Sequence, residues 1–326
     1  MSLLRSSLLT CCLTAALAAQ DLPPAPGRLF DVGSGRRLHL LCTGEGSPTV
    51  VIEAGASSFA IDFTLVQREL QKSHRVCSYD RAGSGWSDPL PPFAPAKDAQ
   101  DLHALLTAAR EPAPYVLVGA SRGGLLIRGY LAAYPSDVAG LVFIDPASED
   151  RLFGVVGGKA IAIAEMTAEQ MRSTLPSQTV RIPRRPVQKG APFDRLPPEL
   201  YQQRLLLDER LIASTPESIT PEQIGAYQEA ERAFLASLLA TRKAGTPFGD
   251  RPTVVLSRGD DPNKEREEVH DKLAKLSTNS RHSVIAGSMH EIHLTHPAAV
   301  ITAIEDVLTA MASKSKLAAI RLNFAF

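Results

Sequence analysis

The sequence predicts an α/β fold: a mostly parallel sheet of eight strands with helices on both faces. Three observations support it. Short runs rich in valine, isoleucine and leucine recur along the chain, amphipathic segments separate them, and the runs are apolar at nearly every position. Strands that are apolar on both faces belong to sheets that helices cover on both sides. A chain of 326 residues can build such a core without disulfides or metals.

The predicted strands fall into two groups, on either side of a long insertion. A Gly-Ser-Gly turn joins the first two, which favours a hairpin. The strands are Arg28–Val32, Arg37–Cys42, Thr49–Glu53, His74–Tyr79, Tyr115–Gly119, Leu141–Asp145, Thr253–Ser257 and Ser283–Ala286. Apolar residues at helical spacing predict helices over Asp62–Gln71, Lys97–Ala109, Gly124–Ala133, Lys264–Leu276 and Ala298–Ala312.

The insertion between the two groups has helical patterns and no strand pattern, with prolines between the helices. Its predicted helices are Val156–Met171, Glu199–Ile212 and Pro221–Thr241. An insertion this long is best explained as an all-helical cap over the strand ends, where ligands bind in open α/β sheets. We therefore expect a core over residues 27–145 and 250–312, a helical cap over 146–249 and a tail over 313–326.

The first residues have the features of a secretory signal peptide, which we place at residues 1–19. Arg5 carries a positive charge, Ser6–Leu17 is small and apolar, and Ala16-Leu17-Ala18 fits a cleavage site. The sequence therefore predicts a secreted or periplasmic protein. Cys42 and Cys77 are the cysteines left after cleavage. A disulfide would suit an exported protein, but sequence leaves open whether they pair or are buried apolar residues.

The charge composition excludes some classes of partner. Lys+Arg and Asp+Glu balance at 35 each, so no field of the whole molecule attracts nucleic acid or an anionic membrane. Beyond the signal peptide, no apolar run reaches the ~18 residues that a membrane span needs. We expect a small-molecule partner, no nucleic acid, no stable membrane insertion and no cofactor.

The segment Gly119-Ala120-Ser121-Arg122-Gly123 matches Gly-x-Ser-x-Gly, with a strand pattern before it and a helical pattern after it. A sharp turn from strand to helix forces the serine into a strained conformation, and the glycines leave room for it. The helix that follows directs its N-terminal dipole and free N–H groups at the site. The pattern predicts that Ser121 is a nucleophile.

Several segments together resemble successive landmarks of single-domain α/β-hydrolases with a helical cap. They are Thr49–Gly55, Tyr79–Ser87, the Gly-x-Ser-x-Gly segment and Leu141–Asp145, and the resemblance covers Leu29–Asp145 and Pro252–Leu308. One departure is Arg122, where an uncharged residue is common.

The family's chain order implies a histidine after the last strand. His290 stands there, in the place of the histidine of a Ser-Gly-His pattern, with Met289 replacing the glycine. His293 and His296 follow at spacings that also allow a metal site, but the loop context and the lack of a carboxylate pair argue against metal. We expect His290 to be the general base and no metal to be bound.

Two carboxylates compete to orient His290. Asp261 follows the penultimate strand, the usual place for the acid, and is favoured. Asp145 ends the strand after the predicted nucleophile helix, where some relatives carry the acid, and is the alternative; Asp260 is a third. Both Asp145 and Asp261 could instead be turn residues before a proline.

The resemblance also implies an oxyanion hole that would stabilise a tetrahedral intermediate. One donor would be the backbone N–H of Arg122 and the other that of Ala56, in the loop after the third predicted strand. The expected reaction is hydrolysis of a carboxylic ester or lactone through an acyl-enzyme on Ser121. An acyltransferase or perhydrolase with the same triad, or a non-catalytic receptor on this fold, remains an alternative.

Overall fold

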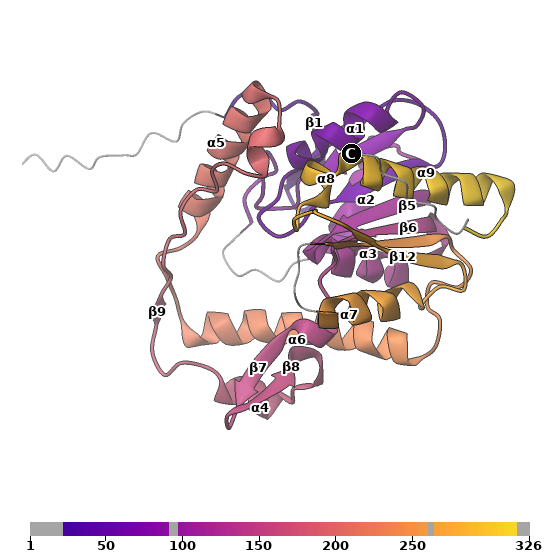
Figure 1. Cartoon of the computed structure of the whole chain (residues 1–326). Helices are drawn as coiled ribbons and strands as arrows, with labels where there is room; N and C mark the ends of the chain where they lie inside the picture. Colours follow the sequence, from indigo (N-terminus) through magenta and orange to yellow (C-terminus); the bar gives the residue numbers. More distant parts are fainter. Residues whose placement is uncertain (1–21, 91–96, 260–263, 318–326) are drawn as a thin grey trace, which may run out of the picture.

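The computed structural model describes residues 22–90, 97–259 and 264–317. A sheet of eight strands runs through it in the order β1-β2-β4-β3-β5-β6-β11-β12 (Figure 1). Pairing is antiparallel between β1 and β2 and between β2 and β4, and parallel elsewhere. The predicted fold class is confirmed. The strands are β1 Arg28–Asp31, β2 Arg37–Thr43, β3 Thr49–Glu53, β4 Val76–Tyr79, β5 Tyr115–Ala120, β6 Val138–Ile144, β11 Thr253–Arg258 and β12 Ser280–Ile285.

Helices cover both faces of this sheet because its central strands are apolar on both sides. In β3, Val50 and Ile52 contribute to one buried cluster and Val51 to another, as the alternation of side chains along a strand requires. Helices α1 and α9 pack on the first face, and α2, α3 and α7 pack on the second. Their bounds are α1 Thr64–Leu70, α2 Asp98–Ala109, α3 Arg122–Ala133, α7 Lys264–Ala274 and α9 Pro297–Ser313, with the short α8 at Ile292–Thr295.

The register of the parallel strands brings several loops to one edge of the sheet. Glu53 at the end of β3 lies opposite Gly119 of β5, and Ala120 lies opposite Ile144 at the end of β6. Leu256 of β11 pairs with Ile144 as well. The segments that follow these strands therefore meet at the carboxyl edge, where open α/β sheets bind ligands.

The insertion contains strands, so the prediction that it is all helical is wrong. The predicted helix Val156–Met171 is replaced by a hairpin of β7 (Phe153–Val156) and β8 (Lys159–Ala162), followed by the short helix α4 (Ala168–Ser173). Gly157 and Gly158, with φ of 57° and 78°, form the two-residue turn of this hairpin. Both central residues of such a turn need positive φ, which glycine adopts freely.

The rest of the insertion consists of two long helices and a narrow ribbon. Helix α5 (Pro198–Ser214) and helix α6 (Pro221–Lys243) match the other two predictions closely, and β9 (Val180–Arg181) pairs with β10 (Ser218–Ile219). Short 3₁₀ helices complete the chain at η1 Ala60–Phe63, η2 Pro135–Asp137, η3 Glu149–Arg151, η4 Ile163–Glu165 and η5 Phe193–Arg195.

The insertion is attached to the core at two separate places. Leu235 and Leu238 of α6 pack against Leu125 of α3, and Leu207 of α5 packs against Phe59 and Trp86. The two long helices therefore lie apart, with the β9–β10 ribbon connecting them on the outside (Figure 1). Among the described residues, no helix has both the length and the apolar character needed to cross a membrane.

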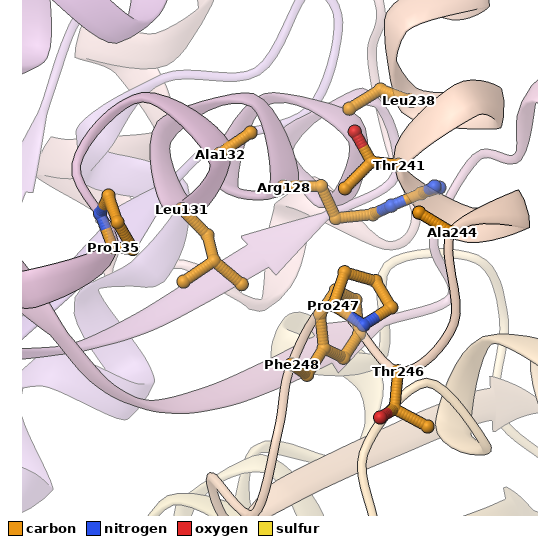
Figure 2. A pocket seen from close by; sticks show the side chains of 10 residues that line it. All are labelled: Arg128, Leu131, Ala132, Pro135, Leu238, Thr241, Ala244, Thr246, Pro247 and Phe248. Carbon is orange, nitrogen blue, oxygen red and sulfur yellow. The ribbon is translucent and has the colours of Figure 1, made fainter.

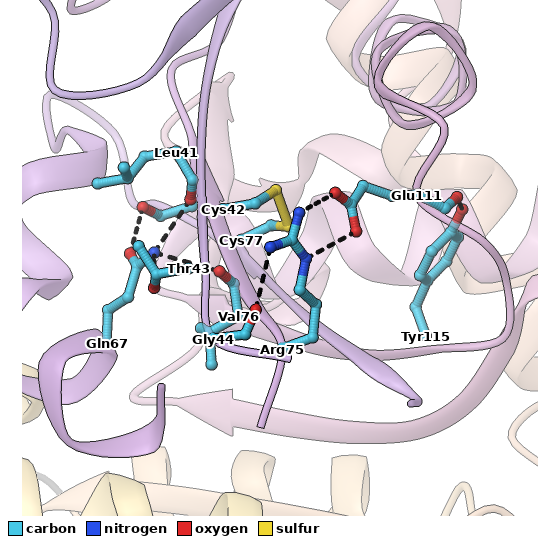
Figure 3. The surroundings of a disulfide bond; sticks show 11 residues. Leu41, Cys42, Thr43, Gly44, Gln67, Arg75, Val76, Cys77, Glu111 and Tyr115 are labelled. Carbon is cyan, nitrogen blue, oxygen red and sulfur yellow. Dashed lines mark hydrogen bonds and ion pairs between the residues drawn. A yellow bond between two sulfur atoms is a disulfide. The ribbon is translucent and has the colours of Figure 1, made fainter. Parts of the chain in front are cut away.

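Cys42 and Cys77 form a disulfide between neighbouring strands (Figure 3). They lie directly opposite each other in the antiparallel pairing of β2 with β4, with Cα atoms 4.0 Å apart. The sequence left this pairing open. Within the described ranges, the one group of three possible metal-ligating atoms is formed by these two sulfurs and a carboxylate oxygen of Glu111. A disulfide offers no thiolate to a metal ion.

Candidate active site

Ser121 stands at the sharp turn between β5 and α3. It is half-buried and has φ 51° and ψ −119°, outside the conformations that non-glycine residues usually adopt. Backbone hydrogen bonds hold it there: its N–H donates to Ile144 O at 2.9 Å, and its carbonyl accepts from the N–H of Ala147 at 2.9 Å. Strain fixed by surrounding bonds in this way is typical of functional sites.

The two glycines of the Gly-x-Ser-x-Gly segment are required by close packing. A Cβ on Gly119 would lie 2.6 Å from Gly123 O, and a Cβ on Gly123 would lie 2.3 Å from Glu53 O. Both distances are far below van der Waals contact, so any side chain would push the turn apart. The sequence prediction of a tight strand-to-helix turn at Ser121 therefore agrees with the backbone geometry.

His290 and Asp145 meet at the same edge of the sheet. His290 lies in the loop between β12 and α8, and its Nδ1 is 2.5 Å from Asp145 Oδ2. The Asp145 side chain is fully buried, whereas 35% of the His290 side chain is exposed. Asp145 has φ 39°, so the left-handed conformation recurs at this second residue of the site. The structure thus pairs His290 with the aspartate that ends β6.

Positive groups surround the carboxylate of Asp145. Arg258 Nε and Arg266 Nη1 lie 3.8 Å and 3.7 Å from its Oδ2. Burial alone would raise the pKa of Asp145, but its hydrogen bond with His290, the charge of His290 and the charge of Arg266 hold the pKa below its usual value. Asp145 is therefore ionised at neutral pH and able to stabilise a protonated His290.

The loop after β3, which we call the β3 loop (Ala54–Ser58), packs against the Ser121 turn. A Cβ on Gly55 would lie 3.3 Å from Ser121 Cβ. Ser57, just beyond Ala56, has φ 56°, a third non-glycine residue of this region in the left-handed conformation. Within the described ranges the N–H groups of Ala56 and Arg122 donate no hydrogen bond to the protein. Their role as oxyanion donors stays a prediction.

The structure does not confirm two other parts of the predicted site. Ser121 and His290, both described, are not joined by a hydrogen bond in this structure; such bonds are often long before a substrate binds. Asp261, the favoured acid of the sequence analysis, and its neighbour Asp260 lie outside the described residues, so their roles stay predictions.

Among the described residues, the three histidines near the C-terminus do not bring their ring nitrogens together as a metal site would. His293 is buried and stacks on Phe63, with ring centroids 4.1 Å apart, and burial lowers its pKa to about 3. His296 precedes the first residue of α9. His290 alone of the three contacts Asp145.

Arg122 has a partner that no local sequence pattern indicates. Its Nη1 and Nη2 lie 2.7 Å and 2.9 Å from the two carboxylate oxygens of Glu231 on α6. This pair connects the insertion to the residue after Ser121 and holds the Arg122 side chain to one side. A cavity of about 430 Å³ adjoins it, lined by Asp98, Arg122, Tyr227, Glu231 and Phe234 among others.

A second cavity, of about 480 Å³, lies at the other end of α3, between that helix and the end of α6 (Figure 2). Leu131 and Phe248 form part of its wall, and Arg128 crosses it to pair with Glu149. Because Ser121 precedes the opposite end of α3, this cavity is separate from the Ser121 site.

The sequence between residues 40 and 303 matches the model of the alpha/beta hydrolase family. The chain belongs to this family. A curated relative over most of this chain is the uncharacterized protein YqjL of Bacillus subtilis, 23% identical over 273 residues, which are 81% of this chain and 85% of YqjL. Matches of 130 and 158 residues to two further curated proteins span only 18% and 30% of their lengths.

Solved structures share the hydrolase fold at low sequence identity. An esterase from Thermogutta terrifontis with malate bound is 20% identical, with a TM-score of 0.57 over 87% of this chain and 97% of its own. The enol-lactonase from Burkholderia xenovorans is 17% identical, with a TM-score of 0.55 over 86% and 99% of the two chains. At these identities the likeness establishes the fold.

Proposed function

We propose that this chain is a serine hydrolase that cleaves a carboxylic ester or lactone of a small molecule. The observation that carries the proposal is the arrangement at the carboxyl edge of the sheet. Ser121 is held in a strained turn, His290 is paired with buried Asp145, and Gly55, the neighbour of Ala56, packs against Ser121. This is the set of groups that acyl transfer to a serine needs.

In the proposed reaction His290 accepts the proton of Ser121 while Ser121 Oγ attacks the substrate's carbonyl carbon. The N–H groups of Ala56 and Arg122 stabilise the oxyanion of the tetrahedral intermediate. Protonated His290, stabilised by Asp145, then gives its proton to the leaving alcohol, and an acyl-enzyme remains. A water molecule repeats the sequence with His290 as base and releases the acid and free Ser121.

An ester or lactone is proposed over an amide because alcohols are better leaving groups. The structural neighbours that are named as an esterase and an enol-lactonase support the same choice. Asp145 rather than Asp261 is proposed as the acid, because Asp145 contacts His290 Nδ1.

We also propose that the protein is exported and works without a metal or other cofactor. The predicted signal peptide lies outside the described residues, but the Cys42–Cys77 disulfide suits an oxidising compartment. Trp86 Nε1 donates to Pro23 O at 2.9 Å, so cleavage near Ala19 would leave this contact intact. Mass spectrometry of the protein from its native compartment should find a mature N-terminus near Ala19 or Gln20; a retained Met1 would contradict export.

The test of the activity is covalent labelling followed by a substrate screen. A fluorophosphonate probe should label the wild type and leave Ser121→Ala unlabelled. Against a panel of p-nitrophenyl esters and lactones, Ser121→Ala should lose several orders of magnitude in kcat with an unchanged fold. Activity above a few per cent of wild type in a clean Ser121→Ala preparation would contradict the serine mechanism. Inactivation by a chelator that zinc reverses would instead indicate a metal-dependent mechanism.

A further inference from the structure

Arg81 makes three short contacts with the last residue of β3 and the first two residues of the β3 loop. Its Nη1 donates to Glu53 Oε1 at 2.5 Å and to Ala54 O at 2.6 Å, and its Nη2 donates to Gly55 O at 2.6 Å. Hydrogen bonds from a charged donor are shorter and stronger than neutral ones. One guanidinium therefore holds two consecutive backbone carbonyls, and the second of them directly precedes Ala56.

The position of Arg81 is itself fixed from both sides. Its neighbour Asp80 is buried and accepts hydrogen bonds from the N–H of Ala60 at 2.8 Å and from His39 Nδ1 at 2.8 Å. Glu53 is buried as well and also accepts a hydrogen bond from Tyr79. Burial alone would lower the pKa of Arg81, but the charge of Glu53 raises it above its ordinary value, so the guanidinium keeps its charge.

The carbonyl of Gly55 and the N–H of Ala56 belong to one peptide group. That group is trans, since each cis peptide bond among the described residues precedes a proline. In a planar trans peptide the C=O and the N–H point in opposite directions. A cation bound to the oxygen therefore directs the N–H away from itself and, by withdrawing electron density through the amide, makes it a stronger hydrogen-bond donor.

We propose that Arg81 is a positioning residue, which orients and polarises the Gly55–Ala56 peptide so that the Ala56 N–H stabilises the oxyanion formed at Ser121. The proposal rests on the proposed function of this site. It adds a residue from the loop after β4 that never touches the substrate. The effect belongs to the transition state, because charge develops on the substrate's oxygen only as Ser121 attacks.

The test compares Arg81→Met and Arg81→Lys with wild type, using p-nitrophenyl butyrate as substrate and n-propylboronic acid as tetrahedral analogue. Removing an oxyanion donor outright costs about 10²–10³ in kcat, so Arg81→Met should cost about 10- to 100-fold. KM should change by less than about threefold. The Ki of the boronic acid should rise by the same factor as kcat/KM falls. Arg81→Lys keeps the charge but has fewer hydrogen-bond donors. It should therefore recover part of the loss in kcat/KM and part of the loss in affinity for the boronic acid.

Arg75 is a matched control, because it also combines an ion pair with a hydrogen bond to a backbone carbonyl (Figure 3). It lies just before β4, pairs with Glu111 at 2.5 Å and donates to Gly44 O at 3.0 Å. Arg75→Met should leave kcat, KM and the Ki of the boronic acid within about twofold of wild type. Equal losses in Arg75→Met and Arg81→Met, or a fall in kcat with an unchanged Ki, would overturn the proposal.

An NMR measurement that needs no substrate turnover tests the role of Arg81 independently of the proposed hydrolase activity. In ¹⁵N-labelled protein, the amide proton of Ala56 should move upfield in Arg81→Lys, because a lysine ammonium cannot reproduce the planar fork that bonds Ala54 O and Gly55 O together, so the hydrogen bond to the Gly55 carbonyl weakens. The same proton should not move in Arg75→Lys. An unmoved Ala56 signal in Arg81→Lys overturns the proposal whatever the activity. If wild type neither reacts with fluorophosphonate nor cleaves any ester, the proposed function fails instead. Should Arg81→Met not fold, Arg81→Lys decides through the Ki and the amide shift.

Discussion

His290 Nδ1 and Asp145 Oδ2 lie 2.5 Å apart, although 145 residues separate them in the sequence. A proton on Nδ1, donated to Asp145, leaves Nε2 unprotonated. In the proposed mechanism, that tautomer is the one the general base needs, and the buried carboxylate that holds it also stabilises the imidazolium. The pair forms because β12 and β6 both end at the carboxyl edge, on either side of β11.

Replacement of the acid should separate Asp145 from Asp261. Asp145→Asn should lower kcat by about 10⁴, because an amide at this position favours the wrong imidazole tautomer. Asp261→Asn is the control and should cost no more than about tenfold. Steady-state kinetics on an ester that wild type cleaves decides the matter. The opposite ranking would assign the acid to the loop after β11, and severe losses in both variants would mean that the two carboxylates act together.

Acid should destabilise the protein through His270, on α7. Its Nε2 lies 2.8 Å from Pro146 O and its Nδ1 2.5 Å from Ser257 Oγ. Burial lowers its pKa from 6.5 to about 4; the hydrogen bond with Pro146 and the charge of Asp145 act to raise this pKa, whereas His282 and Arg266 act to lower it. Between these two pKa values the unfolded chain binds the additional proton. The free energy of unfolding should therefore fall as pH drops from about 6.5 to 4, by about 3 kcal/mol for this residue.

Urea unfolding at a series of pH values measures this effect. His270→Gln should be less stable than wild type at pH 7 but should lose less stability between pH 6.5 and 4. Ser257→Ala is the matched control, because it removes one hydrogen-bond partner and keeps the buried imidazole, so its pH slope should persist. Identical slopes in wild type and His270→Gln would assign the acid sensitivity to other groups.

The disulfide should stabilise the fold without serving the reaction. Cys42 and Cys77 close a separation of 35 residues between β2 and β4, for which chain entropy predicts about 2–4 kcal/mol. The double variant Cys42→Ser/Cys77→Ser should unfold at correspondingly lower urea concentration with kcat within about twofold of wild type. Alkylation followed by mass spectrometry checks the bond. Modification of both cysteines in mature oxidised protein, without a reductant, would contradict it.

Much of this arrangement could be predicted from sequence because it follows from local patterns. Apolar runs predict the strands, and the segments directly after them predict the sharp turn at Ser121 and the place of His290 in the loop after the last strand. The acid could not be decided in the same way. Strands β6 and β11 are adjacent, with Leu256 opposite Ile144, so the residues that follow both strands lie at the same edge. The contact of His290 with Asp145 favours Asp145, whereas Asp261 lies outside the described residues. Chain order alone contains no such contact.

Other features depended on contacts between segments far apart in the chain. Cys42 pairs with Cys77 because β2 lies beside β4, although β3 comes between them in sequence. The contacts of Arg81 with the β3 loop likewise have no local signature. The β7–β8 hairpin is different, because Gly157-Gly158 between short apolar runs is a readable turn signal. The prediction of a helix over Val156–Met171 does not take this signal into account.

The buried pair of Arg204 and Asp62 should have an asymmetric effect on stability. Arg204 Nε of α5 lies 3.2 Å from Asp62 Oδ1, both side chains are 0% exposed, and the guanidinium lies 3.4 Å from the ring centroid of Phe193. Burial raises the pKa of Asp62, so this carboxyl can become neutral if it loses its partner. Arginine cannot. Asp62→Asn should therefore cost about 3–5 kcal/mol, and Arg204→Met distinctly less.

Urea unfolding of the two single variants and of Arg204→Met/Asp62→Asn tests this asymmetry. The double variant should be more stable than Asp62→Asn, because it removes the uncompensated charge. Glu69→Gln is the control for an exposed ion pair, because Lys72 and Glu69 lie 2.7 Å apart with side chains 65% and 54% exposed. Loss of this ion pair should lower the free energy of unfolding by less than about 1 kcal/mol. If Arg204→Met proved as costly as Asp62→Asn, the stabilisation would come from the packing of the Arg204 side chain on Phe193 rather than from its charge. Since Asp62 also accepts hydrogen bonds from Ser58 Oγ and the N–H of Phe59, a loss of kcat confined to the Asp62 variants would indicate that these bonds help to shape the β3 loop.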